Sequence, residues 1–256
     1  DRDGFVIDKS MVYDVLCLLV EVSVHSDISC YNDIFETAFL QETKTYYHIE
    51  STIFLSDNNN SLSRYSKKAE TRIAEEKERI DTYILRQTEE KLRNILNATL
   101  ITQHGAMLLA YEDGLNSLLR EHQLVYLGRI YGLYSRVGSM LDLFRESFYS
   151  YVKTTGSQYM NNQGGGSGTD PSTSTTSSPS VLCKKLTDLK LKSMEITLQC
   201  FQSDKLITRK IKDAFDEIVN VDVRWANYLA MYFDELLKGS KEVTNISSSG
   251  HLCYGA

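Results

Sequence analysis

Apolar residues recur at spacings of three and four through most of this chain, and no stretch alternates strictly with a period of two. Such spacing places side chains on one face of an α-helix. Residues 31–84 carry two stripes of this kind, separated by an Asn-rich break. The stripes are Phe35, Phe39, Tyr46, Ile49 and Ile53, then Leu62, Tyr65, Ala69, Ile73, Ile80 and Ile84. They predict two helices that each bury one face.

The most regular stripe lies in residues 127–151. It consists of Leu127, Ile130, Tyr134, Val137, Leu141, Phe144, Phe148 and Tyr151. This spacing is typical of a helical bundle, although a two-stranded coiled coil would also use it. Gly128, Gly132 and Gly138 each weaken a free-standing helix by up to about 1 kcal/mol. The stripe therefore predicts packing inside a bundle, with a bend or break near Gly138.

A helix is also expected close to the N-terminus. Asp8 or Ser10 can cap it, and it would run from about residue 11 to residue 24. Its expected inner face is Val12, Val15, Leu16 and Leu19. The apolar run at 15–20 is far shorter than the ~20 residues that span a bilayer, so it predicts a buried helix.

Further helices complete an all-α assignment. Thr88 can cap a helix that ends at His104, with Glu89 and Glu90 in its first turn, where the helix dipole favours acids. Three more stripes follow residue 180: Leu182, Leu186, Leu189, Met194, Leu198 and Phe201; Leu206, Ile207, Ile211, Phe215 and Ile218; Trp225, Leu229, Tyr232, Phe233 and Leu236. We expect consecutive antiparallel helical bundles stacked end to end in an elongated, quasi-linear rod.

Both prolines of the chain, Pro171 and Pro179, lie in residues 161–180. This segment is rich in Gly, Ser and Thr, and it offers little apolar surface to bury. It predicts a flexible linker. Its GGGSG sequence is no phosphate-binding loop, because no Gly-Lys-Ser/Thr follows it and no strand precedes it.

Composition limits the classes of function. A formal net charge of −6 argues against binding to nucleic acid or to an anionic membrane. Five cysteines without paired spacing favour a reducing compartment, and we expect the cytoplasm and nucleus. The histidines are too far apart in sequence to suggest a zinc site, so we expect neither a metal nor a cofactor. Catalytic, cofactor-binding and metal-binding residues are all predicted to be absent.

Three residues are candidates for a special role. Arg136 is expected at a helix end or an inter-repeat contact, and His104 is expected to be a hydrogen-bonded histidine within a bundle. Trp225 is the only tryptophan. It could anchor a partner, but a large aromatic on a packed helix is more often part of the core. No nucleophile and base can be paired from the sequence, so an enzyme is the least favoured alternative.

Residues in three parts of the chain closely resemble the cullin family. The second cullin repeat is matched by Phe35, Phe39, Leu40, Tyr46, Tyr47, Glu50, Ser51, Phe54, Leu55, Tyr65, Lys68, Ala69, Glu70, Arg72, Glu75, Glu76 and Arg79. Leu100, Ile101 and His104 are similar to a further family helix, and LGRIYGLYSRV at 127–137 resembles a specific family signature. The third repeat is matched by Leu186, Leu189, Cys200, Phe201, Phe215, Asn220, Asp234 and Leu236 to Lys238.

This resemblance implies a positional function. Cullins are non-catalytic scaffolds of ubiquitin ligases. Their N-terminal helical repeats bind an adaptor that carries a substrate receptor, and their C-terminal part binds a RING protein. The scaffold spaces substrate from the ubiquitin-charged enzyme. The partners implied are therefore proteins. The adaptor-binding residues are unknown.

The resemblance also suggests a division of the chain. Residues 1–30 would end the first repeat, 31–152 would form the second bundle and the start of the third, 181–241 would form part of the third repeat, and 242–256 would be a tail outside the family. We then expect most of the adaptor-binding surface and the RING-binding part to be missing. The alternative is a free-standing helical interaction or tethering protein, or a truncated competitor without ligase activity.

Overall fold

The structure is a computed structural model, and it describes residues 2, 4–24, 29–57, 61–111, 114–161, 179–220 and 225–249. The last described side chain is that of Lys238. Residues 162–178 of the predicted linker and residues 250–256 of the predicted tail lie outside the described residues.

The described part of the chain contains helices and no strand, which confirms the all-α class. In chain order the helices are α1 (Lys9–Val24), η1 (Tyr31–Glu36), α2 (Thr37–Ser56), α3 (Leu62–Thr82), η2 (Arg86–Thr88), α4 (Glu89–Leu96), η3 (Asn97–Thr102), α5 (Gln103–Ala110), α6 (Leu115–Arg120), α7 (Leu124–Tyr134), α8 (Gly138–Asn161), α9 (Pro179–Cys200), α10 (Lys205–Asn220) and α11 (Trp225–Ser249). They form two compact units, residues 1–144 and 145–256.

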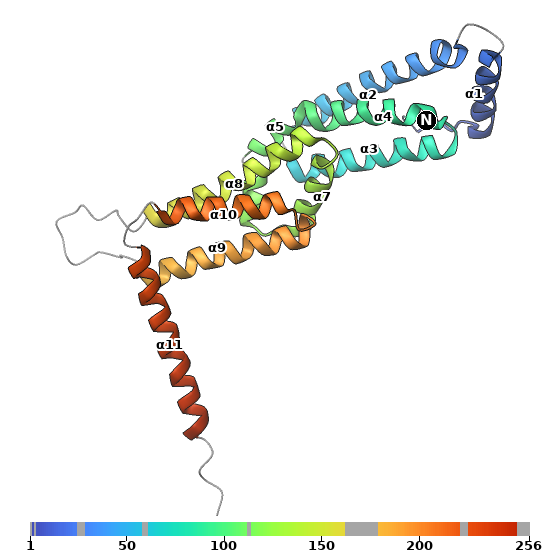
Figure 1. Ribbon diagram of the computed structural model, residues 1–256. Helices are drawn as coiled ribbons and strands as arrows, with labels where there is room; N and C mark the ends of the chain where they lie inside the picture. The colour runs from blue at the N-terminus through green and yellow to red at the C-terminus, as the bar shows by residue number, and fades with distance from the viewer. Residues whose placement is uncertain are drawn as a thin grey trace, which may run out of the picture. The chain divides into compact units, whose positions relative to one another are not determined.

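Within the first unit α4 contacts both α2 and α3, and α3 contacts α7. Figure 1 shows α2, α3 and α4 lying side by side. Ser61 caps α3 by accepting a hydrogen bond from the Arg64 amide. The apolar stripe predicted for α3 is confirmed. Its buried members are Leu62, Tyr65, Ala69, Ile73 and Ile80, together with Ile84 just beyond the helix.

The stripe predicted for α2 is wrong in its second half. Ile49 is 51% exposed and Ile53 is 66% exposed. The side of α2 that faces the bundle instead buries Thr43, Tyr47 and Ser51. These polar side chains are buried because each has a hydrogen-bond partner, which removes the cost of taking them out of water.

The prediction of a buried N-terminal helix is also wrong. In α1 only Leu16 is buried, while Val15 is 47% exposed and Leu18 is 56% exposed. The predicted cap is confirmed, since the Asp8 carboxylate accepts a hydrogen bond from the Met11 amide at 3.0 Å. Within the described part of the chain nothing covers the outer apolar side of α1.

Thr88 precedes α4, but its hydroxyl does not cap that helix. It donates to Glu36 Oε1 instead, at 2.8 Å. The helix expected to end at His104 continues through η3 into α5 and ends at Ala110. The regular stripe at 127–151 is divided between α7 and α8, and the expected break near Gly138 is confirmed.

The second unit packs α9 against both α10 and α11. The Phe148 and Phe201 rings meet edge to face, 5.6 Å apart, and Arg145 forms a 2.7 Å ion pair with Asp204. Part of the predicted core lies outside it. The exposed members of the predicted stripes are Met194, Leu198, Leu206, Phe233 and Leu236. On α9 the buried positions include Ser193 and Thr197, so the inner face of this helix is again partly polar.

Candidate functional site: a groove beside a buried ion cluster

Glu76 on α3 is the centre of a buried ion cluster. Its side chain has no exposed surface, and its Oε1 lies 2.7 Å from Arg2 Nε and 3.1 Å from Arg79 Nη1. The Tyr47 hydroxyl on α2 donates to the same oxygen at 2.5 Å. Two cations and a hydroxyl therefore compensate one buried carboxylate, as a charge in the protein interior requires.

Arg2 connects three parts of the first unit. Its Nη2 donates to Thr43 Oγ1 at 2.6 Å, and its guanidinium lies over the Phe39 ring, 5.2 Å from the centroid. Burial alone would lower the pKa of Arg2, but the hydrogen bond and the charge of Glu76 outweigh it and raise that pKa. Burial, with the Glu76 charge added, raises the pKa of Tyr47 far above its ordinary value. Tyr47 therefore remains a neutral donor, and the cluster holds the N-terminal segment, α2 and α3 together.

A second network joins η1 to η2 and α4. The Tyr31 hydroxyl and Thr88 Oγ1 are 2.6 Å apart, and Lys91 Nζ lies 2.5 Å from Glu36 Oε2. Glu36 is 2% exposed, so its charge is compensated by groups from a segment more than fifty residues away in sequence. Such long-range hydrogen bonds fix how one helix lies against another.

Glu50 on α2 forms a third link to α3. The Glu50 carboxylate accepts hydrogen bonds from Arg72, including one from Nε at 3.0 Å. The same carboxylate forms an ion pair with Lys68 at 3.0 Å. Burial would raise the pKa of Glu50, but these two cations lower it below its ordinary value. The charged form is therefore the one that the fold stabilises.

His104 is hydrogen-bonded, as the sequence predicts. Its Nε2 lies 3.1 Å from Ser51 Oγ, and the Tyr65 ring packs edge-on against it. Burial, followed by the charge of His48, lowers the pKa of His104. The histidine therefore serves the packing of α2 against α3 and α5 in its neutral form.

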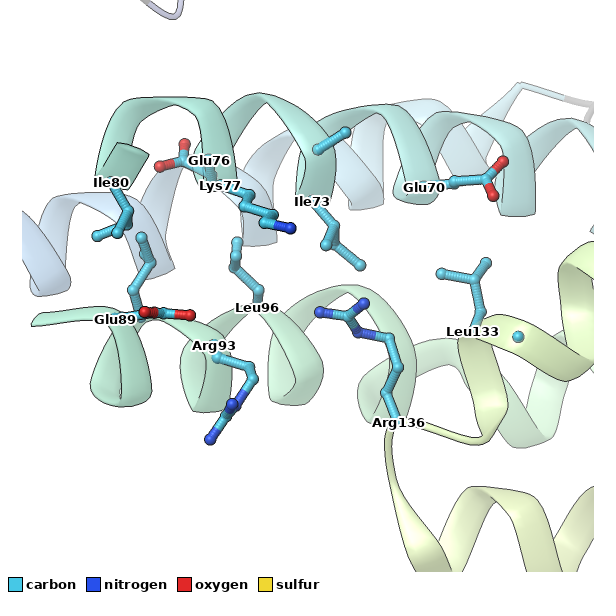
Figure 2. A pocket seen from close by; sticks show the side chains of 13 residues that line it. Glu70, Ile73, Glu76, Lys77, Ile80, Glu89, Arg93, Leu96, Leu133 and Arg136 are labelled. Atoms are coloured by element: carbon cyan, nitrogen blue, oxygen red, sulfur yellow. The ribbon is translucent and has the colours of Figure 1, made fainter. Parts of the chain in front are cut away.

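A groove of about 360 Å³ lies between α3, α4 and the end of α7. Its floor is apolar and its rim is charged. The floor residues are Ile73, Ile80, Leu92, Leu96 and Leu133. The rim residues are Glu70, Lys77, Glu89, Arg93 and Arg136. Figure 2 shows Lys77 extending from α3 and Arg136 extending from beyond α7 into the same gap.

The charges of the rim are unevenly matched. Glu70 is paired with Arg129 at 2.7 Å, and Glu89 lies in the first turn of α4, where the helix dipole favours an acid. Lys77 and Arg93 form no ion pair with any described residue. The Arg136 side chain donates from Nε to the Asn97 amide oxygen at 3.3 Å, and it forms no ion pair with a residue that the structure describes. Among the described rim residues without an ion pair there are three cations and one acid, Glu89, so the groove carries an excess of positive charge above its apolar floor.

The groove combines an apolar floor with a charged rim, which is the composition of a binding surface. The described residues that line it include no Ser, Cys, Thr, His or Tyr, so it contains no nucleophile–base pair. Within the described part of the chain there is no cluster of three His, Cys, Asp or Glu side chains suited to a metal. No helix within those same residues has the length and hydrophobicity needed to span a bilayer.

The sequence located some of these residues and missed others. Arg136 lies at a helix end as predicted, while Trp225, on α11 of the second unit, is only half-buried. Neither the Glu76 cluster nor the groove is predicted from the sequence. The signal that could have found the cluster is Glu76 itself, an acid on the apolar side of the α3 stripe, between Ile73 and Ile80.

Comparisons with known proteins agree on one family. A sequence model of the cullin alpha solenoid domain matches residues 1–250. Cullin-3 of Dictyostelium discoideum is 28% identical over 239 residues, which is 93% of this chain and 29% of that protein. Cullin-3A of Arabidopsis thaliana is 28% identical over 248 residues, 96% of this chain and 32% of its own length. Cullin-2 of Arabidopsis thaliana is 29% identical over 245 residues. The chain thus spans about a third of the length of the curated relatives it matches.

Proposed function

Because this chain belongs to the cullin family, we propose that it is part of the scaffold subunit of a cullin-RING ubiquitin ligase. In this role the chain catalyses nothing. It holds a substrate receptor, carried by an adaptor protein, at a set distance from a ubiquitin-charged enzyme that a RING protein recruits. The match over residues 1–250 is the observation that carries this proposal.

The chemistry of a spacer is positional. A substrate lysine reacts faster when it is held close to the ubiquitin thioester, because its effective concentration there rises. This gain requires a spacer that does not bend freely. Buried or half-buried networks such as those at Glu36, Glu50 and Glu76 support the proposal, because each one fixes one helix against another through directional bonds.

The test is to isolate the natural protein with an antibody raised against this chain and to identify what is bound to it. We expect a RING protein and an adaptor with its substrate receptor. The isolated complex should transfer ubiquitin when it is supplied with ubiquitin, ATP and the activating and conjugating enzymes. The proposal would be contradicted if the isolated complex contained no RING protein and showed no ligase activity. An adaptor recovered without any RING protein would instead favour a competitor that blocks full-length scaffolds.

A further inference from the structure

The groove between α3, α4 and α7 has the composition of a protein-binding surface. Each residue of its apolar floor keeps a small exposed surface, 2–8%, and an apolar side chain placed there would bury it, which favours association. Its charged rim would fix the orientation and exclude partners of the wrong charge.

The charge of the rim indicates which partner would fit. Lys77 and Arg136 reach into the gap from opposite sides, and Figure 2 shows the labelled acids Glu70, Glu76 and Glu89 away from the space between them. Glu70 is occupied by Arg129. A carboxylate entering between Lys77 and Arg136 would therefore gain two cationic partners, whereas a basic group would be repelled.

Gly132 on α7 supplies an independent observation. It lines the groove, and a Cβ added there would meet nothing within 4 Å. The fold therefore does not require glycine at this position, although glycine in a helix costs about 1 kcal/mol relative to alanine. What glycine does provide is bare backbone on the groove wall, to which another chain can approach closely.

We propose that this groove binds a short segment of a partner protein, one that inserts apolar side chains onto the floor and places a carboxylate between Lys77 and Arg136. The partner is thus an acidic, amphipathic peptide segment. This site is independent of the adaptor and RING contacts proposed above, so it can be present or absent whichever way that proposal is decided.

The probe is a phage-displayed library of random 16-residue peptides, selected on the full chain and, in parallel, on an unrelated helical bundle. We expect enrichment of peptides that carry Leu, Ile or Phe at helical spacing, flanked by Asp or Glu. An enriched peptide, labelled with fluorescein, then gives dissociation constants by fluorescence anisotropy.

Gly132→Trp tests the location, because the indole would fill the groove from its wall. We expect it to weaken binding by about tenfold or more, the effect of losing a central contact of an interface. Gly138→Trp is the matched control. A side chain there also meets nothing within 4 Å, and Gly138 does not line the groove. Gly132→Ala adds only a methyl group to the wall and should weaken binding less than Gly132→Trp does.

Charge reversal tests the chemistry. Lys77→Glu together with Arg136→Glu should reject the acidic peptides and select basic ones. Lys184→Glu together with Lys212→Glu makes the same change in net charge on exposed sites of the second unit and should leave selection unchanged. Circular dichroism confirms that each variant is folded.

Three results would overturn the proposal. The first is that no peptide is enriched over the unrelated bundle. The second is that enriched peptides lack acids or bind Gly132→Trp as tightly as the parent. The third is that the charge-reversed variant selects the same peptides as the parent.

Discussion

At the scale of single residues, Glu76 has the greatest influence on the first unit. It is fully buried, and its carboxylate is the common partner of Arg2, Arg79 and Tyr47. A buried ion cluster adds little net stability over apolar packing, but removal of one member leaves the others uncompensated. Its role is therefore to make the packing of α2 on α3 specific.

Glu76→Gln should destabilise the chain by about 3 kcal/mol, because the two guanidiniums lose their counter-charge inside the protein. Urea unfolding followed by circular dichroism measures this change in the free energy of unfolding. Glu78→Gln is the control on the same helix. Glu78 is 68% exposed, and its ion pair with Lys9 is long, at 3.5 Å. Loss of the Glu78 charge should therefore cost less than about 0.5 kcal/mol of stability. Equal losses in the two variants would contradict the assigned role.

The lowered pKa of His104 predicts that the free energy of unfolding depends on pH. Its pKa in the fold is lowered below the ordinary value of 6.5, so the unfolded chain binds the proton more readily. The contribution of His104 to stability is therefore complete above the unfolded pKa and is lost as the pH falls through the folded pKa.

The free energy of unfolding should thus fall more between about pH 7.5 and pH 5.5 in the parent than in His104→Gln, in which the group cannot titrate. Urea unfolding at both pH values measures the difference. If parent and variant lost the same free energy, His104 would not be the group responsible.

At the scale of whole helices, sequence pattern was a good guide for α3 and a poor one for α2. The buried side of α3 is made of apolar residues, so the spacing of Leu62, Tyr65 and Ala69 shows it directly. The buried side of α2 contains Thr43, Tyr47 and Ser51, while Ile49 and Ile53 are exposed. Periodicity cannot find a polar inner face, because its stabilising partners come from distant segments of the chain.

Two helical glycines should respond in opposite ways to alanine. Gly132→Ala meets open space and should stabilise the chain by up to about 1 kcal/mol through helix propensity. Gly156→Ala would place its Cβ against Ile218 on α10, which is 1% exposed and cannot move into solvent. Overpacking of this kind costs about 1–3 kcal/mol, so this variant should be less stable than the parent.

Thermal unfolding of both alanine variants measures this contrast. Gly138→Ala is the control, because it also meets open space and lies outside the groove. A lower melting temperature for Gly132→Ala than for the parent would show that Gly132 is required by the fold, and it would remove one support of the proposed binding groove.

At the scale of the whole molecule, the sequence was sufficient for the fold class and the family. Ordered matches such as LGRIYGLYSRV carry far more information than helical spacing alone, and the match over residues 1–250 agrees with them. The groove could not be predicted, because it forms where α3, α4 and α7 meet and no single helix encodes it. The predicted repeat boundaries remain predictions.

The proposed role as a spacer is most directly tested by small-angle X-ray scattering of the chain in solution. A compact domain of this length would have a radius of gyration of about 18 Å. An extended stack of bundles predicts a value well above this, with a distribution of interatomic distances that has a long tail. A value close to that of the compact domain would contradict the account, because such a chain could not hold its partners apart.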